Sequence, residues 1–151
     1  MRTIYDALRE SHEIQRSLCR RLLLAKPETG KREIILNELH IELAAHAASE
    51  ERFLYAPILM DDMGLDPSRH ALAEHHEIDE CIEELTNASY EGGSWLATAK
   101  ELSRIVRHHL KEEETKFFQI SGKILTDVQK TKLAGRYDKD YQRMKKVLSA
   151  K

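Results

Sequence analysis

The chain of 151 residues has few cysteines: only Cys19 and Cys81, which stand far apart within helix-like patterns. This pair is neither the dense framework of a disulfide-stapled secreted domain nor a zinc-binding cysteine motif. The first residues, MRTIYDALRE, are charged and lack the apolar core of a secretory signal. We therefore expect a cytoplasmic protein in a reducing environment.

An excess of charge and long apolar runs are also missing. The formal net charge is −2, so composition gives no reason to expect binding to nucleic acid or to an anionic membrane. No charge-free stretch approaches the roughly 20 residues that a membrane-spanning helix needs. With 41% hydrophobic and 33% charged residues, the composition is that of a globular domain and not of a disordered chain.

Proline and glycine are scarce, and they interrupt helical patterns instead of filling loops. Between the interruptions, apolar residues recur every three or four positions, with no sustained strand alternation. This spacing predicts helices at residues 3–25, 30–61, 67–88 and 94–124. Because short connections favour antiparallel neighbours, we expect an all-α, up-down four-helix bundle.

A fifth, shorter helix is expected at the C-terminal end. The segment TDVQ at 126–129 has the form of a capping box. We expect residues 1–125 to form the bundle and residues 126–151 to pack on it as a C-terminal helix. Asp66 and Ser94 are the expected N-caps of the third and fourth helices.

Several of the eight histidines belong to an internal repeat with a step of 63 residues. The repeated set consists of His12, His46 and Glu50 in the first copy and of His75, His109 and Glu113 in the second. The apolar pattern follows the same step. We therefore expect two duplicated helical hairpins that pack about a pseudo-two-fold axis and bring the six side chains together.

The repeated set has the chemistry of a buried metal site. Residues four apart share a helix face, and the faces that carry the set also carry core-type residues. Burying unpaired carboxylates would cost several kcal/mol or more, and no lysine or arginine recurs on both faces to offset that cost. A single histidine on an apolar face is more often a hydrogen-bonded core residue. The repetition of the whole set is what indicates metal ligands.

The ligand types leave more than one metal open. Four imidazoles and two carboxylates, without a usable thiolate, suit zinc or a pair of transition-metal ions. Bundles with inward-facing Glu and His commonly hold di-iron or di-manganese centres. Carboxylates contributed by two symmetric halves can bridge two such ions.

Three stretches, HAASEERFLYAP, AEHHEID and HHLKEEETKFF, resemble the hemerythrin-like HHE cation-binding domain family. The resemblance covers most of residues 1–125. It implies a four-helix bundle that holds two non-haem iron ions with an oxo or hydroxo bridge. Members of this family carry oxygen, sense oxygen, nitric oxide or iron, or handle peroxide, and the family alone does not choose among these functions. A catalase-like enzyme, a sensor and a metal-free helical interaction module are further hypotheses for this chain.

Two further residues are candidate ligands. Oxygen-carrying hemerythrins have another histidine one turn after the third-helix ligand, where this chain has Asp79. Asp79 is an extra ligand, a partner of its repeat mate Arg16, or a solvated side chain. Glu42, one turn before His46, is a ligand or an acceptor that orients a histidine.

The remaining histidines are expected to lie outside the centre. His76 and His108 are neighbours of proposed ligands, rotated by about 100° around their helices, and the repeat register selects the ligands over them. His40 and His70 should lie on the surface. Two aromatic residues that follow the glutamates, Tyr55 and Phe118, are expected to wall the pocket, although core packing alone would also explain them.

Overall fold

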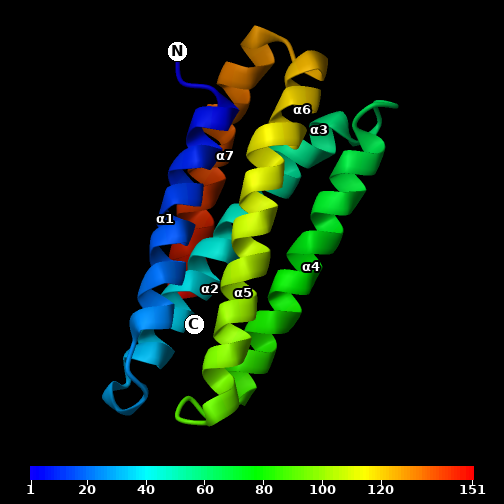
Figure 1. The fold of residues 1–151 in the computed structure, drawn as a ribbon. Helices are drawn as coiled ribbons and strands as arrows, with labels where there is room; N and C mark the ends of the chain where they lie inside the picture. The colour runs from blue at the N-terminus through cyan, green and yellow to red at the C-terminus, as the bar shows by residue number, and fades with distance from the viewer.

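The computed structural model describes residues 1–151, and its regular elements are all helical (Figure 1). The bundle consists of α1 (Ile4–Leu24), α2 (Lys31–Glu50) continued by η2 (Glu51–Tyr55) and α3 (Ala56–Leu59), α4 (Leu65–Asn87), and α5 (Gly93–Glu112) continued by η3 (Glu113–Phe117) and α6 (Phe118–Ile124). The short η1 (Pro27–Thr29) joins α1 to α2, and α7 (Asp127–Ser149) follows the bundle. The predicted all-α, up-down bundle is confirmed.

The helices form a ring in which each hairpin contacts the other. In this ring α1 packs beside α2 and α5, and α4 packs beside α5 and α2. The last helix, α7, lies along α1 and α2, on the side of the bundle away from α4 (Figure 1). No helix is long and apolar enough to cross a membrane.

The starts of two helices differ from the predicted ones. The helix α4 begins at Leu65 with Gly64 as its N-cap, so Asp66 lies inside the first turn. A Cβ on Gly64 would lie 2.2 Å from the carbonyl oxygen of Ile58, so this tight approach, and not an acidic cap, sets the start. Likewise α5 begins after Gly92, and Ser94 is not its cap. The predicted capping box at the C-terminal helix is confirmed, because Thr126 and Gln129 bond reciprocally.

The C-terminal helix lies within the expected residues 126–151 and shares the core of the bundle. It has 23 residues, as many as α4, so it is not shorter than every helix of the bundle. Its buried residues Leu133, Tyr137 and Tyr141 belong to the same apolar cluster as Ile4 and Leu8 of α1. Because these apolar residues of α7 are buried against the bundle, α7 is part of the same folded unit.

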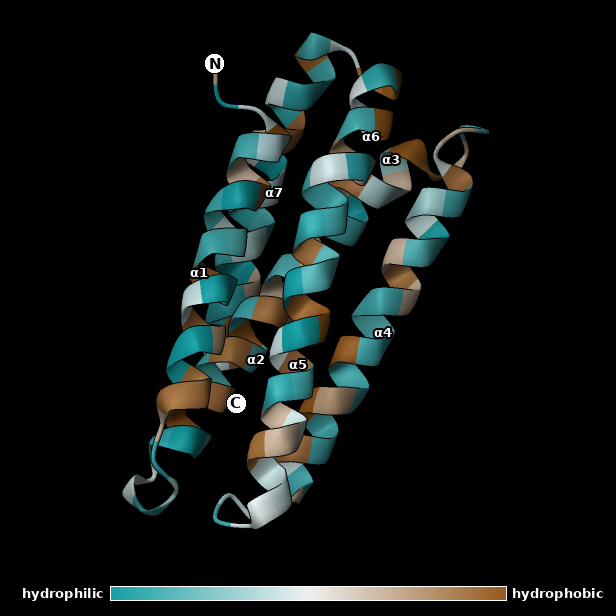
Figure 2. Ribbon diagram, viewed as in Figure 1, coloured by the Kyte–Doolittle hydropathy of each residue, from teal (hydrophilic) through white to brown (hydrophobic).

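Amphipathic helices divide the interior into two apolar clusters with a polar layer between them. Figure 2 shows hydrophilic and hydrophobic segments alternating along the helices. One cluster lies toward the α1–α2 and α4–α5 turns and contains Leu18; the other lies toward α3 and α6 and contains Leu8. His12 stands between these two residues on α1. The repeated histidines and glutamates therefore occupy the layer that separates the two clusters.

A charged hydrogen-bond network joins α7 to the bundle. The buried carboxylate of Glu42 on α2 accepts bonds from Ser11 Oγ at 2.6 Å, from Tyr141 Oη at 2.7 Å and from Lys145 Nζ at 3.1 Å. We expect Tyr141→Phe to lower the free energy of unfolding by roughly 1.5–3 kcal/mol, as is usual for a hydrogen bond to a charged group. Urea denaturation would measure it.

The matched control is Tyr5→Phe, since the Tyr5 hydroxyl pairs with the neutral Ser121 hydroxyl at 2.8 Å. That change should cost about 0.5–1.5 kcal/mol. A loss for Tyr141→Phe no larger than for Tyr5→Phe would contradict the role of the Glu42 network.

Candidate metal centre

The structure brings the six side chains of the repeated set into one buried cluster. All six are among the buried residues of the protein. Their potential ligand atoms form two groups, each within 4.8 Å, and the groups share Glu50. The first group is His12, His46, Glu50 and Glu113, and the second is Glu50, His75 and His109. The helical spacing and the 63-residue register thus converge in space as the sequence predicts.

Distances across the cluster follow the expected pseudo-two-fold symmetry. His12 Nε2 lies 3.1 Å from Glu113 Oε1, and its repeat mate His75 Nε2 lies 3.3 Å from Glu50 Oε1. Within each hairpin, the histidine and the glutamate one turn apart are also close. His46 Nε2 lies 3.5 Å from Glu50 Oε1. His109 Nε2 lies 3.7 Å from Glu113 Oε2. Each glutamate therefore contacts histidines of both hairpins.

Partners outside the cluster hold the other ring nitrogen of each histidine. His12 Nδ1 donates to Glu114 Oε2 at 2.7 Å, and His75 Nδ1 donates to Glu51 Oε2 at 2.8 Å. Glu51 and Glu114 are also 63 residues apart, so these contacts obey the repeat. Metal-binding histidines usually have such an acceptor, which fixes the ring and leaves Nε2 for the metal. These two acceptors were not predicted from the sequence, although the register could have found them.

The other two outer partners break the symmetry. His109 Nδ1 donates to Glu74 Oε1 at 2.8 Å, whereas His46 Nδ1 pairs with the Tyr137 hydroxyl at 3.0 Å. The repeat mate of Glu74 is Ser11, which binds elsewhere. Tyr137 belongs to α7, which has no counterpart in the second hairpin. No sequence signal identifies Tyr137, because only the docking of α7 brings it to His46.

Four buried atoms in the cluster have no hydrogen-bond partner. They are His12 Nε2, His46 Nε2, Glu50 Oε2 and Glu113 Oε1. His12 Nε2 and Glu113 Oε1 are close but are not oriented for a hydrogen bond. The contacts of both glutamates are to histidines and to Tyr55, and neither pairs with a lysine or arginine. Since each unpaired buried group costs about 1–3 kcal/mol, this concentration of lone pairs fits a bound cation.

The pKa shifts show that the cluster attracts positive charge. Burial would lower the pKa of His12, but the close Glu113 carboxylate and the hydrogen bond to Glu114 outweigh burial and raise the pKa to about 9. The pKa of His75 rises to about 10, because contacts led by Glu50 outweigh burial there too. Burial and the charge of Glu50 raise the pKa of Glu113. Metal ions would take the place of these imidazole protons.

Two π-helical segments, one directly after Glu50 and one beginning at Glu113, aim the next aromatic residues. Ala56 N–H donates to Glu51 O, and Phe118 N–H donates to Glu113 O, five residues back in each case. Because a π turn holds more residues than an α turn, the side chain at i+5 returns nearly over i. The Tyr55 hydroxyl consequently donates to Glu50 Oε1 at 2.7 Å and also to Glu113. Tyr55 thus does more than wall the pocket, whereas its repeat mate Phe118 stacks on His12.

Comparison with known proteins agrees with this geometry. Residues 3–120 match the model of the Hemerythrin HHE cation binding domain. The chain belongs to this family. A crystal structure of a hemerythrin HHE cation binding domain-containing protein from Mycobacterium kansasii is similar in fold, with a TM-score of 0.86 and 22% identity. The alignment covers 97% of this chain and 90% of that one. No curated protein matches the chain in sequence.

The two further candidate ligands lie outside both groups of this HHE domain. Asp79 is exposed, and it belongs to neither group of ligand atoms. Arg16 does not pair with it, since Arg16 Nη2 binds Glu114 Oε1 at 2.7 Å. Glu42 neither joins the cluster nor orients a histidine, because its oxygens are taken by partners that include Tyr141. Tyr141 and Lys145 of α7, a helix outside the repeat, hold the Glu42 carboxylate outside the metal centre.

The four histidines that were expected to lie outside the metal centre are on the surface of the domain. The side chains of His76 and His108 are 76% and 62% exposed, and His40 and His70 are exposed as well. His76 pairs with Glu80 one turn ahead on α4. The repeat register therefore separates the buried histidine from its exposed neighbour on both α4 and α5.

Proposed function

We propose that this hemerythrin-like protein holds two non-haem iron ions and uses them to bind or react with dioxygen or peroxide. The observation that carries the proposal is the buried cluster of imidazoles and carboxylates with four unpartnered polar atoms. Inward-facing Glu and His in a helical bundle are typical of di-iron and di-manganese proteins. Bound iron would supply the electrons that reactions of dioxygen and peroxide exchange.

The proposed ligands divide between two ions. They are His12, His46, Glu50, His75, His109 and Glu113. The two glutamates, each in contact with histidines of both hairpins, would bridge the ions, and the family resemblance adds an oxo or hydroxo bridge. The two buried free cysteines are consistent with a cytoplasmic setting, which we include in the proposal.

Tyr55 and the neighbouring phenylalanines shape the chemistry at the centre. Burial and the nearby Glu113 and Glu50 raise the pKa of Tyr55 well above its usual range. The phenol therefore keeps its proton and donates it in hydrogen bonds to both carboxylates. Phe117 packs edge-on against Tyr55 with ring centroids 5.0 Å apart. This packing excludes water from one side of the carboxylate pair.

Metal analysis and visible absorption test the proposal directly. Protein loaded with Fe²⁺ and desalted should retain about two equivalents of iron and, after oxidation, show oxo-to-iron absorption bands. A purified chain that never retains iron and never develops such bands would exclude the di-iron function.

The fate of peroxide distinguishes a catalase-like enzyme from an oxygen carrier or a sensor. Sustained oxygen release at catalytic protein concentration would identify the enzyme. A stoichiometric spectral response without turnover would identify oxygen or peroxide binding, as in carriage or sensing.

A pair of adjacent variants tests the assignment of ligands on α4. His75 is buried in the cluster, whereas His76 is exposed beside it. We expect His75→Ala to weaken iron binding by roughly 10–100-fold or more, since loss of supporting groups alone has that effect. His76→Ala should retain the wild-type iron content. Iron loss in His76→Ala with retention in His75→Ala would move the proposed ligand by one residue.

A further inference from the structure

A second group of histidines and glutamates lies near the surface, beside the buried centre. His70 and Glu74 stand one turn apart on α4, and His108 and Glu112 stand one turn apart on α5. His70 Nε2 lies 2.8 Å from Glu112 Oε1, and His108 Nε2 lies 3.0 Å from Glu112 Oε2. Two imidazoles therefore converge on one carboxylate from two helices. We call these four residues the surface cluster.

The surface cluster has the ligand chemistry of a transition-metal site. Potential ligand atoms of His70, Glu74 and Glu112 lie within 4.8 Å of one another. The ion pairs of both glutamates are all with imidazoles, and no lysine or arginine pairs with either one. Imidazole combined with carboxylate suits Fe²⁺, Mn²⁺ or Zn²⁺. The pattern repeats the His–Glu pairing of the buried centre at an accessible position.

A cavity of about 250 Å³ is lined by residues of both the surface cluster and the buried centre. Its lining includes the exposed His70 and the half-buried Glu74 and Glu112, together with the buried His109 and Glu113. The same space therefore touches both the surface cluster and two proposed iron ligands. An ion held by His70 and Glu112 would need no unfolding of the bundle to approach the centre.

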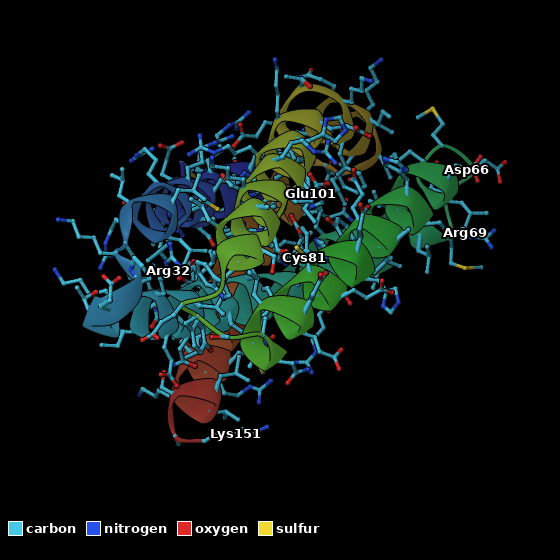
Figure 3. All side chains as sticks on the ribbon, turned by 60° about the horizontal axis from the view of Figure 1, so that its bottom comes forward. Arg32, Asp66, Arg69, Cys81, Glu101 and Lys151 are labelled. Carbon is cyan, nitrogen blue, oxygen red and sulfur yellow. The ribbon has the colours of Figure 1, made fainter.

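The charged lining favours a cation along this route, because four acidic side chains line the cavity against one lysine, Lys116. Asp66, labelled near the start of α4 in Figure 3, also lines the cavity. Glu74 links the two sites directly, because its Oε1 accepts from His109 Nδ1 at 2.8 Å while its Oε2 lies 3.5 Å from His70 Nε2. The Glu74 carboxylate would therefore lie between a cation at the surface cluster and His109.

We propose that the surface cluster binds one divalent transition-metal ion and that the cavity delivers such ions to the buried centre. The binding site stands on the geometry of the surface cluster alone. The delivery step rests on the proposed di-iron function.

The first experiment counts ions on the iron-loaded full chain. Calorimetric titration with Zn²⁺, with iron content checked before and after, should detect about one further ion in the wild type. The double change His70→Ala and His108→Ala should weaken this binding by roughly tenfold or more, a loss typical of groups that support a metal. Glu74 is left unchanged because it also holds His109.

The matched control for this titration is His76→Ala. His76 is exposed on α4 and pairs with Glu80 one turn away at 2.7 Å, but no second helix contributes to that pair. It should bind the further Zn²⁺ as the wild type does. Absence of a further Zn²⁺ in the wild type, or equal binding by the double variant, would overturn the surface site.

The second experiment follows delivery. Metal-free full chain is mixed with Fe²⁺ without oxygen, and retained iron is measured after rapid desalting at timed intervals. The double variant should load roughly tenfold more slowly, in line with its weaker capture, and should reach the wild-type iron content. Equal loading rates would reject the route through the cavity. A chain that takes up no buried iron but still binds Zn²⁺ at the surface cluster would reject the di-iron function and leave the surface site standing.

Discussion

Glu50→Ala is expected to cost the protein both irons instead of one. Glu50 belongs to both groups of ligand atoms, with His46 Nε2 at 3.5 Å and His75 Nε2 at 3.3 Å from its Oε1. Its removal also leaves the positive charge of the ions less compensated inside the bundle. We expect iron affinity to fall by roughly 100-fold or more, beyond the usual effect of an outer partner. Metal analysis after desalting would show loss of both equivalents together.

Glu113→Ala should behave in the same way, because Glu113 contacts histidines of both hairpins, His12 and His109. Glu51→Gln is the matched control, since Glu51 holds only His75 Nδ1 from outside the cluster. It should cost roughly 10–100-fold and act mainly on one ion. Far-ultraviolet circular dichroism would verify that each variant folds. Full retention of one iron in Glu50→Ala or Glu113→Ala would contradict a shared carboxylate bridge.

Removal of the metal should lower the melting temperature strongly. The centre places buried carboxylates and imidazoles with unpartnered atoms in the layer between the two apolar clusters. Ions that bind only the folded state at 1,000 times their Kd stabilise it by about 4 kcal/mol. Each kcal/mol shifts Tm by about 2–4 °C in a domain of this size, so chelation should lower Tm by roughly 10 °C. Calorimetry of iron-loaded and chelated samples would measure the shift.

The control for chelation is His46→Ala, which removes a buried Nε2 that has no hydrogen-bond partner. With a damaged centre, this variant should show a much smaller chelator-dependent shift than the wild type. Identical melting temperatures for loaded and chelated wild type would instead support the metal-free interaction module.

Much of the site could be predicted from the sequence because its determinants are local and repeated. A histidine four residues before a glutamate shares its helix face whatever the rest of the fold does. The 63-residue step then relates His46 to His109 and Glu50 to Glu113. Two copies of one hairpin bury equivalent faces, so equivalent side chains meet. The same reasoning separated His75 from its exposed neighbour.

Local backbone geometry limited that reasoning. A constant helical period does not predict the π-helical segments after Glu50 and Glu112, yet the first of them aims Tyr55 at both carboxylates. The helix start at Leu65 likewise depends on the close approach of Gly64 to Ile58. Both features are set by contacts between turns that are not visible in apolar spacing.

The sequence by itself determined the helices, their pairing into two hairpins and the six residues that meet between them. Only the tertiary structure decided what surrounds that set. Docking of α7 drew Glu42 to Tyr141 and brought Tyr137 to His46, while the packing of α4 against α5 created the surface cluster. The physical reason is that helical periodicity places a side chain on a face of its own helix. Which residue of another helix lies opposite that face depends on how the helices dock.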